Sequence, residues 1–189
     1  MNIWYPQFSD KQFRTVIRIA LLGAVIGGLY GMIHDQISYT ISSEYFTKLK
    51  FRQFSYANFG WHPRIFAAEV GLIACSGVGL IVGWFLARAG LADLPTAKRG
   101  LAIVRSFALV FGITVIVEVI GAAIGVNVVN TSDLQDWSEW QRGFNLQNLP
   151  GFVIVVYLHN AAYIGGTIGT IAAVVYVRRL KVVPSLTNL

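Results

Sequence analysis

Four long apolar runs are the feature that most constrains the fold of this 189-residue chain. A helix needs about 20 consecutive apolar residues to cross the hydrocarbon core of a bilayer, and runs of about that length cover 15–33, 65–87, 101–129 and 151–177. Only 13% of the residues are charged, whereas soluble domains carry roughly 25%. The sequence therefore predicts an all-α integral membrane protein, a four-helix transmembrane bundle that forms a single membrane domain over 1–189.

The segments between the runs predict the topology. Segments 34–64 and 130–150 lie on one side and are rich in polar and aromatic residues, which predicts short interfacial helices there. Ten basic residues lie on the side of the two termini and the 88–100 connection, and five lie on the other: Lys11, Arg14, Arg18, Arg88, Lys98, Arg99, Arg105, Arg178, Arg179 and Lys181 against Lys48, Lys50, Arg52, Arg64 and Arg142. Because cytoplasmic flanks carry the excess of Lys and Arg, we predict that both termini are cytoplasmic.

Charge and cysteine content exclude several classes of function. The net charge of +6 does not indicate nucleic-acid binding, because the basic residues stand at the ends of apolar runs rather than in one patch. The expected partner is the lipid bilayer. Cys75 is the only cysteine, so a disulfide within the chain is excluded, and no base stands near it on its own run to support nucleophilic catalysis. The residues assign no reaction, and a non-catalytic role is the expectation.

Glycines recur at four-residue spacing in every apolar run: Gly23, Gly27, Gly31, Gly79, Gly83, Gly121, Gly125, Gly165 and Gly169. Such stripes let helix backbones approach closely in lipid, where no hydrophobic effect drives helices together. We expect them to pack the helices of one bundle. The alternative is that one stripe joins copies of the chain in a homo-oligomer or docks it to a larger membrane complex.

The segment 34–54 has a dense pattern without glycine or proline, HDQ-x-x-YTIS-x-EYFTK-x-KF-x-QF. Ser42 or Ser43 is placed to cap a short helix that runs through about Phe54. The pattern resembles the signature of an uncharacterised family of small bacterial four-span membrane proteins, and His159-Asn160 with a following Gly-Gly is similar as well. The resemblance implies a bacterial inner (cytoplasmic) membrane protein of four-span topology, and it implies no activity.

Ionisable side chains inside the spans form the candidate site, because such groups are unfavourable in lipid and mark functional positions by default. His34 and Asp35 close the first run, Glu69 lies about one turn into the second, and Glu118 and His159 lie at similar depth in the third and fourth. We predict one interior cavity that opens to the outside. Glu118 and His159 form its inner end, and the other three residues form its mouth.

Three interpretations of these residues stay open. The leading functional prediction is a site that binds or conducts a proton or a small cation. A metal ion held by His34, Glu69, Glu118 and His159 is the second, because imidazole and carboxylate are ligands for iron, manganese and zinc, although no span contains the Glu-x-x-His pair of di-iron bundles. The third is a hydrogen-bonded network that only fixes helix register.

A haem between His34 and His159 is disfavoured, because the two residues are expected to differ in depth by about three helical turns. With almost no mass outside the spans, the chain either works through its spans or is a non-catalytic accessory subunit of a larger membrane complex.

Overall fold

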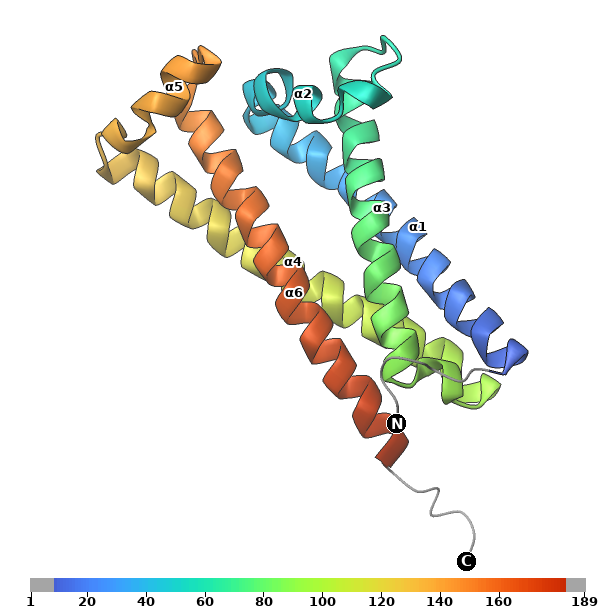
Figure 1. Cartoon of the computed structure of the whole chain (residues 1–189). Coiled ribbons are helices and arrows are strands. Elements are labelled where there is room, and N and C mark those ends of the chain that lie inside the picture. The colour runs from blue at the N-terminus through green and yellow to red at the C-terminus, as the bar shows by residue number, and fades with distance from the viewer. Residues whose placement is uncertain (1–8, 183–189) are drawn as a thin grey trace, which may run out of the picture.

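The computed structural model describes residues 9–182, with side chains to residue 180, and within this range it contains helices and no strand. Its architecture rests on four long helices, α1 (Asp10–Ile41), α3 (Pro63–Ala89), α4 (Thr96–Thr131) and α6 (Leu149–Val182) (Figure 1). Each contains a stretch long and apolar enough to cross a membrane. The prediction of an all-α, four-helix membrane protein is confirmed.

The long helices form two pairs. α1 packs along α3, and α4 packs along α6, while contacts between the pairs are fewer and run mainly from α6 to α3 and α1 (Figure 1). The predicted glycines all lie where paired helices touch: Gly23, Gly27, Gly31, Gly79 and Gly83 between α1 and α3, and Gly121, Gly125, Gly165 and Gly169 between α4 and α6. A Cβ added at Gly169, for example, would lie 2.8 Å from the carbonyl oxygen of Val110. The glycine stripes therefore pack helices of the same chain, so these faces are not available to a second copy.

Short helices cover the end of the molecule at which α1 and α4 finish. Between α1 and α3 lie a π-helical segment η1 (Tyr45–Lys50), α2 (Phe51–Gln53) and η2 (Ser55–Ala57); between α4 and α6 lie η4 (Gln135–Trp137) and α5 (Ser138–Phe144) (Figure 1). The Ser42 hydroxyl accepts a hydrogen bond from the backbone N–H of Tyr45 at 3.3 Å, which starts the short helical segment expected here. At the other end a single turn, η3 (Leu91–Asp93), joins α3 to α4.

The two covering segments are joined by a carboxylate. Glu44 accepts hydrogen bonds from the backbone N–H groups of Gln147 (3.0 and 3.1 Å to its two oxygens) and Asn148 (2.7 Å), just ahead of α6. A carboxylate at a helix N-terminus satisfies free N–H groups and interacts favourably with the helix dipole. Beneath this contact, Phe46, Phe152 and neighbouring apolar side chains form a buried core.

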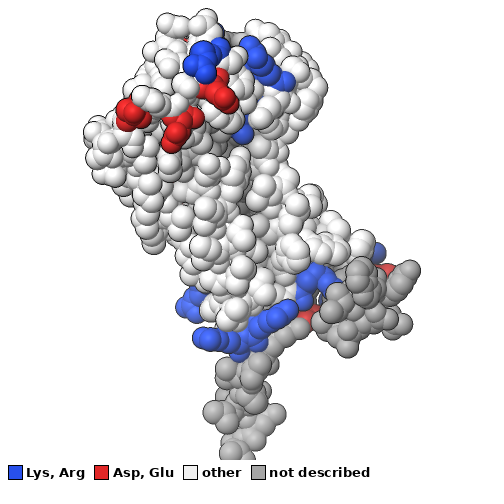
Figure 2. All heavy atoms as spheres, turned by 60° about the vertical axis from the view of Figure 1, so that its left-hand side comes forward, with Lys and Arg blue, Asp and Glu red and all other residues white. Residues whose placement is uncertain are grey.

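Lys and Arg side chains lie toward the two ends of the long helices. Figure 2 shows Lys and Arg gathered at both ends, with an uncharged zone between them on the face in view. The ten basic residues assigned to one side of the membrane fall in the first turns of α1 and α4 and the last turns of α3 and α6; of these, only the Lys181 side chain lies outside the described part. The uncharged zone between the ends has the distribution expected for a protein in a lipid bilayer.

α1 runs further than its apolar stretch suggested. It continues to Ile41, so His34 and Asp35 lie about two turns inside the helix, which corrects the prediction that they close it. The reason is that His34, Asp35 and Ser38 are buried and locally bonded: for example, Ser38 Oγ donates to the His34 carbonyl at 3.0 Å. Polar groups that find partners inside the protein do not need to end the helix to reach water.

Candidate functional site

His34, Asp35 and His159 form a buried polar cluster where α1 faces α6. One candidate ligand atom from each residue lies within 4.8 Å of the other two. His34 Nδ1 is 3.0 Å from Asp35 Oδ1, and His159 Nε2 is 3.9 Å from the same oxygen. The three residues are 8%, 5% and 5% exposed, so the cluster is buried within the protein.

Aromatic rings and one hydroxyl hold His159 in place. Its ring lies 4.6 Å from the ring of His34, edge to face, and 4.6 Å from the ring of Tyr45, measured between centroids. The centroid of Phe46 is 6.1 Å away. His159 Nε2 lies 3.3 Å from the hydroxyl oxygen of Ser38. These neighbours orient the Nε2 edge of the ring toward Asp35 and Ser38.

Tyr45 comes from the π-helical segment outside the four long helices. Burial raises the pKa of the Tyr45 phenol well above its usual range, and the nearby Tyr163 and Asp35 raise it further. The phenol therefore stays protonated and neutral beside the cluster. A π-helical turn is often found at functional sites, and here it carries two rings, Tyr45 and Phe46, that pack on His159.

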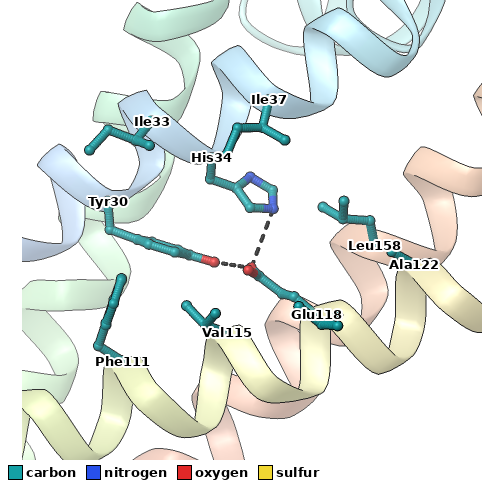
Figure 3. A pocket seen from close by; sticks show the side chains of 10 residues that line it. Tyr30, Ile33, His34, Ile37, Phe111, Val115, Glu118, Ala122 and Leu158 are labelled. Atoms are coloured by element: carbon teal, nitrogen blue, oxygen red, sulfur yellow. Dashed lines mark hydrogen bonds and ion pairs between the residues drawn. The ribbon is translucent and has the colours of Figure 1, made fainter.

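Glu118 of α4 reaches the cluster through His34. Its Oε1 is 3.3 Å from His34 Nε2, and the same oxygen accepts a hydrogen bond from the Tyr30 hydroxyl (Figure 3). The imidazole nitrogen is close enough for an ion pair but is not aligned for a hydrogen bond, and His34 Nε2 is a buried nitrogen without a hydrogen-bond partner in the described part of the chain. His34 thus stands between two carboxylates, Asp35 at Nδ1 and Glu118 at Nε2.

The arrangement differs from the predicted one in two respects. The expected separation of His34 and His159 by three helical turns is wrong, because their rings are in contact. The division into an inner end and a mouth is therefore wrong as well. The reason is that α1 continues beyond His34, so distance from the end of an apolar run does not measure depth in the membrane.

Glu69 is not a member of the His34, Asp35 and His159 cluster. It is half-buried on α3, and its Oε2 is a buried oxygen without a hydrogen-bond partner within the described residues. The expected metal ligands were His34, Glu69, Glu118 and His159. The residues that lie close enough together to share an ion are His34, His159 and Asp35, so the predicted ligand set is corrected at Glu69 and Glu118.

Residues that complete the site were not singled out in the sequence. Tyr30 and Ser38 stand four residues before and after His34, and residues at this spacing share one face of a helix. That stripe was visible as a signal in the sequence. The contacts of Tyr45 and Phe46 with His159 were not, because they join segments more than 100 residues apart.

Chemically, the cluster offers two imidazoles and a carboxylate in a dry environment. Neither Asp35 nor Glu118 forms an ion pair with a Lys or Arg in the described range. Asp35 is buried and Glu118 is partly buried, and carboxylates without a basic partner favour a positive charge beside them. Compared with known proteins, the chain matches no protein-family model, no curated protein and no solved structure.

Proposed function

We propose that the chain is a multi-pass protein of a bacterial inner membrane, with both termini in the cytoplasm, that binds a small cation at His34, Asp35 and His159. The four apolar helices support the membrane location. The excess of basic residues at one end supports the orientation. The resemblance of segment 34–54 to small bacterial four-span proteins supports the bacterial membrane.

The observation that carries the cation site is the convergence of three ligand atoms within 4.8 Å in a buried place. Two imidazoles and one carboxylate are a ligand set for first-row divalent ions such as Fe²⁺, Mn²⁺ and Zn²⁺, whereas Mg²⁺ and Ca²⁺ prefer oxygen ligands. His34 would offer Nδ1 to the ion, because this nitrogen faces Asp35. Its Nε2–H would then face Glu118, the kind of carboxylate partner that orients metal-bound histidines.

Metal content of the purified protein tests this proposal. The protein is isolated in mild detergent, equilibrated in turn with Mn²⁺, Fe²⁺ or Zn²⁺, freed of excess ion and assayed by elemental analysis. We expect about one ion per chain, and its loss in Asp35→Asn and in His159→Asn. The matched control is His62→Asn: His62 is exposed and caps α3 through its side chain, and Asn is equally suited to that position. A wild-type protein that retains none of the three ions would overturn the metal site.

A proton is the second candidate cation, and one observation favours it. His34 lies 3.0 Å from Asp35 and 3.3 Å from Glu118, and a neutral imidazole has only one N–H to share between two carboxylates. When His34 takes up a second proton, both of its ring nitrogens carry a hydrogen, so Asp35 and Glu118 each face an N–H. Nitrogen-15 NMR of labelled histidine in metal-free protein measures the protonation state of each ring. We expect one imidazolium in the wild-type protein. The Glu118→Gln variant should lose it, whereas the control variant Glu69→Gln should keep it. Three neutral histidines at neutral pH would exclude it.

A further inference from the structure

A cavity of about 280 Å³ lies beside the cluster, between α1 and α4. Its walls come from two helices that belong to different pairs, and Leu158 of α6 completes the lining beside Ala122 (Figure 3). The three polar side chains in its lining are Tyr30, His34 and Glu118; the other lining residues are apolar. The cavity therefore combines an apolar body with one polar wall, the usual composition of a small-molecule site.

The cavity opens sideways. Ile33 is 65% exposed, and Ile37 and Val119, which also line it, are more than half exposed. These apolar side chains lie on helices long and apolar enough to cross a membrane, so the rim faces lipid rather than water. A molecule that enters by this route must first dissolve in the bilayer.

The polar wall presents a donor and an acceptor side by side. His34 is one of the lining residues, and its Nε2 is buried and has no hydrogen-bond partner in the described chain. Glu118 Oε1 lies 3.3 Å from it. A hydroxyl group satisfies both, because it accepts a hydrogen bond from an imidazole N–H and donates one to a carboxylate. A protonated amine would satisfy only the carboxylate, because an ammonium group has no acceptor.

The aromatic residues in the lining and the volume of the cavity indicate the size and type of ligand that fits. Tyr30 and Phe111 meet edge to face at the cavity wall, with centroids 5.7 Å apart, and aromatic ligands pack well on such pairs. A cavity of about 150 Å³ holds benzene. At about 280 Å³ this one has room for a single substituted ring, while a tail can extend between the exposed apolar side chains into lipid.

We propose that this cavity binds the head group of a membrane-soluble phenol or hydroquinone. The ring lies among the apolar side chains between α1 and α4, and its hydroxyl bridges His34 Nε2 and Glu118. The proposal rests on the membrane location of the chain and not on an occupied cation site. It is compatible with one, because a His34 that carries its proton on Nε2 leaves Nδ1 free to face Asp35.

Equilibrium binding of a radiolabelled hydroquinone with a decyl tail tests the proposal. The full chain is placed in phosphatidylcholine nanodiscs, and empty nanodiscs measure partition into lipid. We expect saturable binding of one molecule per chain. Ala122→Leu fills the cavity and should weaken binding at least about tenfold, and Glu118→Gln, which removes the charged acceptor, should also weaken it about tenfold. The matched control is Ala123→Leu, the same change at the next, exposed residue of α4, which is outside the lining.

Three results would overturn the proposal: no saturable binding by the wild-type protein, equal affinities of Ala122→Leu and Ala123→Leu, or saturable binding of decylamine in place of the hydroquinone. Circular dichroism of each variant checks that it is folded. Metal content is measured on the Ala122→Leu sample as well, and we expect it to equal the wild-type value. The proposal of a ligand in the cavity and the proposal of a cation site can thus be refuted independently.

Discussion

Replacing Gly83 by alanine should weaken the contact between α1 and α3. A Cβ at this position would lie 2.6 Å from the carbonyl oxygen of Ile19 and 2.9 Å from the Cα of Ala20. Both neighbours are backbone atoms of a helix, so no side chain can turn away. Ordinary contact begins at 3.4 Å, so the helices must separate locally by about 0.8 Å (3.4 minus 2.6).

The size of the expected loss of stability follows from this separation of the two helices. A gap of about 0.5–1 Å forfeits a quarter to a half of the dispersion energy of the atoms concerned, and overpacking of a tight contact typically destabilises by about 1–3 kcal/mol. Alanine is favoured over glycine within a helix by about 0.5–1 kcal/mol, which partly offsets the loss. We expect Gly83→Ala to lower the free energy of unfolding by about 1–2 kcal/mol.

The assay compares two glycines of the same helix. Gly77 lies on α3 with nothing within 4 Å of an added Cβ, so Gly77→Ala keeps the helix-propensity gain without the clash. Thermal unfolding in dodecyl maltoside is followed by circular dichroism for both variants and the wild type. The Gly83→Ala midpoint should fall below the wild-type midpoint, and that of Gly77→Ala should equal or exceed it. Equal midpoints for the two variants would refute the packing argument.

Three further predictions concern the covering segments and the cluster. Glu44→Ala should destabilise the fold by about 1–2 kcal/mol, because it leaves N–H groups at the start of α6 without their acceptor; chemical unfolding measures this against Glu139→Ala, and equal stabilities would contradict it. Ser38→Ala should not weaken metal binding, because the contact between the Ser38 hydroxyl and His159 Nε2 is lost in any case when that nitrogen binds the ion. Titration calorimetry measures this against Thr167→Ala, which loses only a hydroxyl bonded to its own helix, and a clearly lower affinity of Ser38→Ala would contradict Nε2 as the ligand atom. Metal affinity should fall as the pH is lowered, because protons compete for the imidazole and carboxylate ligands; an affinity that stays constant between pH 7.5 and pH 5.5 would exclude imidazole ligands.

Much of the fold could be predicted because its causes are local. A run of about 20 apolar residues must be helical to satisfy its backbone in lipid, and each of the four runs lies within one long helix. Glycines such as Gly23 and Gly79 at four-residue spacing marked the helix faces that touch. The polar residues at 34, 35, 118 and 159 were recognisable one by one, since an ionisable group in an apolar run stands out without any knowledge of its neighbours.

What the sequence by itself determined is therefore the set of helices and the list of unusual polar residues. The tertiary structure decided which of these residues meet. It paired α1 with α3 and α4 with α6, brought His159 against His34, and left Glu69 out of the cluster. Contacts depend on where each helix starts, how far it continues and which face it turns to a neighbour. These properties arise from packing between segments far apart in the chain, and the cavity between α1 and α4 exists only because two separate pairs lie side by side.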